Sequence, residues 1–209
     1  MSKPTESFSA LPTTRRTAIS ALAVAAATVI GSGSTASAWS LFRRNSAPSS
    51  EPVDLSGISQ EWLRREGSEV AAYADFLSKI GLRHLQPSQV IAAHAKRRGS
   101  VWNKLPPRAM WKNIAPTLKV VDRISEELGQ PVKEVISVYR CAAYNARCAG
   151  ASSGSWHQKN FAVDVSFAAP ASVVASKARR LRGEGFFKGG VGRYPTFTHI
   201  DTRGQNVDW

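Results

Sequence analysis

Two histidines and one aspartate in the last third of the chain have the residue types and spacing of a metal site. His157 and Asp164 are separated by six residues, and His199 follows in a later segment. We expect Asp164 on a strand over residues 162–167 and His199 on a strand over about 196–202, where side chains alternate between faces. Two imidazoles and one carboxylate are the protein ligands of many catalytic zinc sites, which leave a fourth position for water. The spacing predicts a Zn²⁺ site, although two ordinary hydrogen-bonded histidines would also account for it.

The other two histidines do not share this pattern. His84 and His94 lie in surroundings rich in lysine and arginine, without a carboxylate at ligand spacing. We expect both to be surface or packing residues.

The elements that must position the site are helices followed by short strands. Val70, Tyr73, Leu77 and Ile80 form one apolar stripe on a helix that ends at Gly81. The same patterning predicts further helices after Pro87 up to about Gly99, from Ile114 to Leu128 before Gly129, and over residues 170–182. It predicts strands over residues 132–139, 162–167 and about 196–202. A glycine-rich turn is expected over residues 183–192. Helices first and strands later predict an α+β fold.

The first residues resemble an export signal. A paired arginine, Arg15-Arg16, precedes an apolar run of 13 residues, which is shorter than the roughly 20 needed to span a bilayer, and small residues follow up to Ala38. We expect residues 1–38 to be a twin-arginine signal peptide, residues 39–57 a Ser/Pro-rich linker and residues 58–209 the folded domain. An uncleaved anchor or a chance Ala-rich helix are the alternatives. Export predicts a location in the periplasm or cell envelope, with no membrane span after processing.

Composition and charge restrict the class of protein and of partner. The 209 residues are 43% hydrophobic and 21% charged, which argues against a disordered, collagen-like or multi-span membrane protein. The net charge is +13, and without residues 1–38 it is still +11, from 25 basic and 14 acidic residues. Such basicity implies an anionic partner: nucleic acid, an anionic membrane or an acidic wall polymer. Export favours the wall polymer over nucleic acid.

Several short segments resemble, in order and spacing, the zinc D-Ala-D-Ala peptidases of the M15 family, and most of all its small exported murein peptidases. They are Ser137-Val138-Tyr139-Arg140, Tyr144-Asn145, Ser155-x-His157 with Ala162-x-Asp164, Gly190-Val191-Gly192-x-Tyr194-Pro195 and His199-Ile200-Asp201. The resemblance covers residues 100–209 well and residues 82–99 loosely. It implies a small antiparallel sheet with packed helices around one zinc ion, bound by His157, Asp164 and His199, and hydrolysis of peptide bonds in peptidoglycan. It also implies that Arg140 polarises the scissile carbonyl or binds a substrate carboxylate, unless it is an ordinary salt-bridge partner.

Two positions depart from the family pattern. Asn160 stands where relatives often have glycine, and asparagine is the next-best residue for a left-handed turn. Relatives place a catalytic Glu or His shortly before the last histidine ligand, where this chain has Thr196 and Phe197. Asp201 is the candidate base, because two residues along a strand it shares the face of His199. Support of a metal ligand is the competing role for Asp201, and Glu184 is a second, less constrained candidate.

Two further groups of residues stay open. Cys141 and Cys148 either pair, which would close the loop after Arg140, or remain as two thiols. Four aromatic residues either line a groove for sugar or peptide or pack in the core: Trp102, Trp111, Trp156 and Tyr194.

These observations lead to three hypotheses of function. The first is an exported zinc murein peptidase, either an endopeptidase or a carboxypeptidase. The second is a zinc-stabilised peptidoglycan-binding module without hydrolysis, because the usual base is missing. The third rests on charge alone and is a basic exported protein that binds nucleic acid or anionic lipid.

Overall fold

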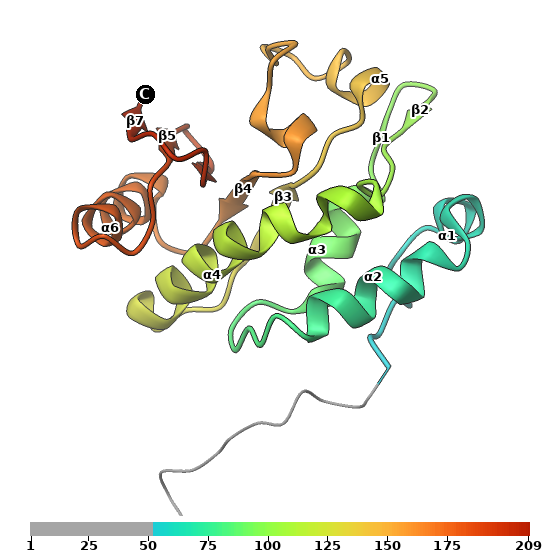
Figure 1. Ribbon diagram of the computed structural model, residues 1–209, viewed down its shortest axis with the longest axis horizontal. Coiled ribbons are helices and arrows are strands. Elements are labelled where there is room, and N and C mark those ends of the chain that lie inside the picture. The colour runs from blue at the N-terminus through green and yellow to red at the C-terminus, as the bar shows by residue number, and fades with distance from the viewer. Residues whose placement is uncertain (1–51) are drawn as a thin grey trace, which may run out of the picture. The chain divides into compact units, whose positions relative to one another are not determined.

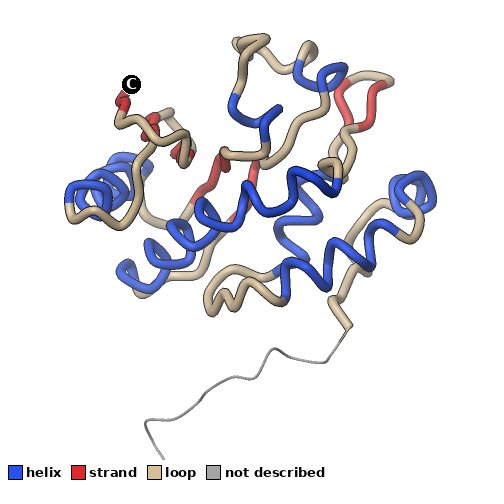
Figure 2. Tube along the Cα trace, in the orientation of Figure 1, coloured by secondary structure: helices blue, strands red, loops and turns tan. Residues whose placement is uncertain are grey.

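The computed structural model describes residues 52–209 as helices and short strands (Figure 1, Figure 2). The predicted signal peptide and the linker before residue 52 lie outside the described residues. The described part mixes helices with a small, largely antiparallel sheet, which confirms the predicted α+β class. None of its helices is both long and apolar enough to cross a membrane.

Four of the helices were predicted from the sequence, whereas Gln60–Glu66 and Ala142–Asn145 were not. In residues 52–209 the α-helices are α1 (Gln60–Glu66), α2 (Glu69–Ser78), α3 (Pro87–His94), α4 (Trp111–Leu128), α5 (Ala142–Asn145) and α6 (Ala171–Gly183). Helix α4 ends at Gly129 in the left-handed conformation, as expected. Helix α3 ends at His94, short of the predicted Gly99. The reason is that β1 (Arg97–Arg98) and β2 (Val101–Trp102) form a hairpin around Gly99.

The sheet has five strands in the order β3-β4-β6-β5-β7. Their bounds are β3 (Glu134–Ser137), β4 (Ala162–Ser166), β5 (Gly190–Arg193), β6 (Thr198–Asp201) and β7 (Val207–Asp208). All neighbours pair antiparallel except β5 and β7, which are parallel. Strand β5 overlaps the glycine-rich segment predicted as a turn, so that prediction was wrong for residues 190–192. Pairing with β6 and β7 overrides the low intrinsic strand preference of glycine.

The two faces of the sheet have opposite characters. Val163, Val165, Val191 and Ile200 are fully buried, on the sheet face against which α4 and α6 pack. Each such side chain contributes roughly 1.5 to 3 kcal/mol of hydrophobic free energy. The strand alternation therefore directs the intervening residues, which carry the polar groups, to the opposite face.

Candidate metal centre

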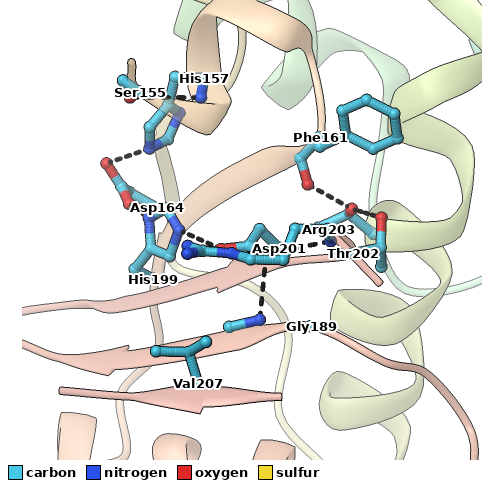
Figure 3. A network of polar contacts seen from close by, with 12 residues as sticks. Ser155, His157, Phe161, Asp164, Gly189, His199, Asp201, Thr202, Arg203 and Val207 are labelled. Carbon is cyan, nitrogen blue, oxygen red and sulfur yellow. Dashed lines mark hydrogen bonds and ion pairs between the residues drawn. The ribbon is translucent and has the colours of Figure 1, made fainter. Parts of the chain in front are cut away.

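His157, Asp164 and His199 come together on the face of the sheet away from these helices (Figure 3). All three are buried, and one potential ligand atom from each lies within 4.8 Å of the others. Asp164 on β4 and His199 on β6 are directly opposite each other in the antiparallel register. The sheet thus brings together two residues that are 35 positions apart in the sequence.

His157 reaches this point from a short 3-10 helix, η3 (Trp156–Lys159). The hydroxyl of Ser155 accepts a hydrogen bond from the backbone N–H of His157 and caps the helix. Asn160 ends the helix in the left-handed conformation with a φ of 58°, and its side chain donates to the Met110 carbonyl at 2.9 Å. The expectation that asparagine would maintain this turn is confirmed.

The hydrogen bonds of His157 fix which ring nitrogen faces Asp164. Nδ1 lies 2.5 Å from the Val138 carbonyl, which can only accept, so Nδ1 carries the proton. Burial lowers the pKa of His157 despite the opposing effect of Asp164, which favours the neutral ring. Nε2 of that ring presents a lone pair 3.2 Å from an Asp164 carboxylate oxygen. A metal ion between these two acceptors would be bound by both.

His199 lies between two carboxylates. Its Nδ1 is 2.8 Å from Asp164 and its Nε2 is 3.0 Å from Asp201. Burial alone would lower the pKa of His199, but these hydrogen bonds outweigh it and the pKa is raised. If a cation bound at the Asp164 side, the neutral ring would donate from Nε2 to Asp201 and offer its Nδ1 lone pair to that cation. Two imidazole nitrogens and one carboxylate form a donor set that fits zinc.

Asp164 is held as a carboxylate. Burial alone would raise the pKa of Asp164, but the contacts with His157 and His199 outweigh it and the pKa is lowered. Arg140 adds an ion pair, with Nη2 2.5 Å from Asp164. The ionised form that a metal ligand requires is therefore already favoured.

Arg140 is positioned from three directions. Its Nε donates to the Ser137 hydroxyl at 2.7 Å, and its backbone N–H donates to the His157 carbonyl. The side chain of Asn103, which is almost fully buried, donates to the carbonyl of Tyr139 and accepts from the N–H of Cys141, the two neighbours of Arg140. The role of Asn103 in positioning Arg140 could not be predicted from the sequence, because its hydrogen-bond partners are 36 and 38 residues away.

Asp201 lies behind His199 rather than in the open site. It is fully buried and accepts hydrogen bonds from the backbone N–H of Gly190 and from Arg203 through Nε at 2.7 Å and Nη2 at 2.5 Å. Burial alone would raise the pKa of Asp201, but these donors and His199 outweigh it and the pKa is lowered. These contacts match the supporting role that was the alternative to a base. Glu184 is exposed and pairs with Arg180.

A cleft of about 500 Å³ opens above the three residues. Asp201 and Glu184 do not line it. Besides the three residues, its lining consists of Arg140, Ala149, Gly150, Ala151, Ser152, Gly154, Ser155, Trp156, Tyr194, Phe197, Arg203 and Trp209. Two of the four aromatic residues considered in the sequence, Trp156 and Tyr194, therefore face the cleft. Trp111 packs on Tyr73, and Trp102 donates to Glu61. The sequence did not indicate Trp209, because only the pairing of β7 with β5 brings it here.

The two cysteines are unpaired. The Cys148 thiol lies 3.4 Å from the Tyr144 carbonyl, and the Cys141 thiol points toward the Trp102 carbonyl. The position of Arg140 therefore rests on Asn103 and Ser137 and not on a disulfide.

Comparison with known proteins adds one finding. No match is found among curated proteins or among solved structures. Residues 83–201 match the family described as Peptidase M15. This segment is more than half of the chain and contains His157, Asp164 and His199. The chain belongs to the peptidase M15 family.

Proposed function

We propose that this protein is an exported zinc peptidase that hydrolyses peptide bonds in the stem peptides or crosslinks of peptidoglycan. The observation that carries the proposal is the convergence of two imidazole rings and one carboxylate in the lining of an open cleft. His157, Asp164 and His199 would bind the ion. A bound zinc ion supplies Lewis acidity, which activates water and polarises the scissile carbonyl.

Arg140 is the substrate-facing cation of this proposal. Its guanidinium borders the cleft beside Asp164, and it is fixed before any substrate arrives. A guanidinium offers two parallel N–H donors to a carboxylate or to the negative charge that develops on a carbonyl oxygen. Arg140 would therefore orient the substrate at the bond that is cut.

Asp201 acts on the reaction through His199 in this proposal. Its carboxylate would accept a hydrogen bond from Nε2–H and so leave Nδ1 free for the ion. The variant Asp201→Asn, described in the Discussion, distinguishes this positioning role from the role of general base.

The substrate and location rest on the sequence. The charge of +11 after residue 38 attracts an acidic polymer, and the paired arginines favour export to the envelope, where peptidoglycan lies.

One observation favours a second function, a zinc-stabilised module that binds peptidoglycan without cutting it. Among the described residues that line the cleft, there is no carboxylate or imidazole side chain besides the three proposed ligands. A hydrolase needs a group that takes a proton from the attacking water. A module that only binds peptidoglycan does not need such a group.

Incubation with purified, labelled peptidoglycan separates the two functions. The peptidase proposal predicts soluble muropeptides and new amino termini, both of which disappear when a chelator removes the metal. Zinc content with cosedimentation but no new termini would support the binding module instead. If the protein neither releases muropeptides nor cosediments with peptidoglycan, both functions are contradicted.

A further inference from the structure

Three aromatic side chains form one side of the cleft, next to His199. We call Tyr194, Phe197 and Trp209 the aromatic wall. Tyr194 and Phe197 are stacked, with ring centres 4.4 Å apart and planes inclined by only 10°. The indole of Trp209 lies 5.1 Å from the His199 ring and donates from Nε1 to the Tyr194 hydroxyl at 2.9 Å. Tyr194 remains 37% exposed and Trp209 44% exposed, so these rings present apolar surface to the cleft.

The backbone holds the wall in place. Strand β7 pairs with β5, and the residue that follows it, Trp209, accepts from the Arg193 N–H and donates to the Val191 carbonyl. Arg179 and Arg182 both bind the neighbouring Asp208 carboxylate. Gly192 leaves the space for the indole, because a Cβ atom there would lie 2.5 Å from it. The wall is therefore a built surface and not a loose aromatic cluster.

The guanidinium of Arg203 also stacks on the aromatic wall. The Arg203 guanidinium lies between the rings of Trp156 and Trp209, at 5.1 and 5.2 Å from their centres. The same guanidinium pairs with the buried Asp201 that supports His199. Small residues also line the cleft, namely Ala149, Gly150, Ala151, Ser152, Gly154 and Ser155. The lining thus combines aromatic rings with small residues.

The chemistry of the wall selects one part of peptidoglycan. Stem peptides carry methyl groups, carboxylates and amino chains, none of which offers a flat apolar face. The pyranose rings of the glycan do offer one, edged with hydroxyl groups. Aromatic rings with a polar edge, such as Tyr194 with its hydroxyl, pack well on such amphipathic surfaces. We infer that the aromatic wall binds a saccharide ring of the glycan strand. This inference rests on the proposed function, and it implies that the enzyme prefers stem peptides that are still attached to sugar.

Two matched substrates test this inference. One is a crosslinked disaccharide-peptide, and the other is the same crosslinked peptide after an amidase has removed the sugars. We expect the wild-type protein to cleave the sugar-linked substrate with a kcat/KM roughly 3- to 10-fold higher, as for one or two aromatic contacts. Trp209→Leu and Tyr194→Ala should lower kcat/KM for the sugar-linked substrate more than for the sugar-free peptide, so that the ratio falls toward one. Phe186→Ala, at an exposed aromatic residue that does not line the cleft, should keep the wild-type ratio.

A binding measurement keeps this inference separate from the proposed function. Peptide-free glycan strands should change the tryptophan fluorescence of the full chain and should bind Trp209→Leu at least about 3-fold more weakly. Circular dichroism of each variant shows whether it is folded, and Tyr194→Ala replaces Trp209→Leu if the latter is not. A wild-type ratio of one, or equal glycan binding by wild type and both variants, would overturn the inference while leaving peptide hydrolysis intact. If no peptide is cut, the proposed function fails, and glycan binding alone decides whether the wall recognises sugar.

Discussion

At the scale of single residues, the outer contacts of the two histidines decide what they can bind. The Val138 carbonyl accepts a hydrogen bond from Nδ1 of His157, and Asp201 lies at Nε2 of His199, so each ring turns its other nitrogen toward Asp164. The sequence could predict the three clustered residues because metal chemistry restricts their types. It could not predict the Val138 contact, because a backbone carbonyl carries no sequence signal.

Asp201→Asn tests the outer contact of His199. We expect zinc affinity to fall by about 10- to 100-fold, because the amide no longer holds the Nε2 proton with a full negative charge. Excess zinc should then restore most of the hydrolysis rate. Zinc affinity is measured by competition with a coloured chelator. Unchanged zinc affinity with a rate at least ~10²-fold lower would instead identify Asp201 as the general base.

At the scale of elements, apolar periodicity predicted the helices that cover the sheet, whereas strand β5 was missed. Periodicity reports burial, and α4 buries a continuous stripe that includes Ile114, Leu118 and Val121. Strand β5 has two glycines in four residues, and only its tertiary partners make it a strand. The same glycines leave room for Arg203 and Trp209 beside the site, so this error of prediction falls at a functional position.

Asn160 tests the turn that positions His157. Asn160→Ala should lower the free energy of unfolding by about 2 kcal/mol. Alanine is strained in the left-handed conformation, and it also loses the hydrogen bond to the Met110 carbonyl. Asn160→Gly removes only the bond and should cost about 1 kcal/mol or less. Urea unfolding of the two variants measures the difference. Equal stability of the two would show that the left-handed backbone contributes nothing.

At the scale of the whole molecule, the buried His94 links stability to pH. It is fully buried beside Tyr73. This confirms the expectation of a packing role. Burial lowers the pKa of His94 to about 3, below the value near 6.5 of an unfolded histidine.

The sign of the pH dependence follows from this lowered pKa. Above pH 6.5 the ring is neutral in both states, so its contribution to stability is fully present. Between pH 6.5 and about 3 only the unfolded chain binds the proton, so stability falls as pH falls. From pH 6.5 to 5 the loss from this residue should be about 2 kcal/mol. His94→Leu should remove that part of the slope in urea titrations, whereas His84→Leu, at an exposed histidine, should retain it.

The export prediction also concerns the whole chain. Replacing Arg15 and Arg16 together by lysine should leave the precursor inside the cell, because twin-arginine export depends on that pair as a receptor-read address. Cell fractionation of the double variant and of the single variant Lys3→Arg, which keeps the pair, measures this. Equal export of both would indicate a general secretory route or an anchor.

Reconstitution with zinc tests the central claim most directly. The metal is removed with a chelator, zinc is returned in defined equivalents, and new amino termini in peptidoglycan are counted at each step. The claim that His157, Asp164 and His199 form one catalytic zinc site predicts a rate that rises linearly to one equivalent and then stops rising. His84→Ala should follow the same curve, and His157→Ala should stay near zero throughout. Hydrolysis without zinc, or an unchanged curve for His157→Ala, would contradict the account.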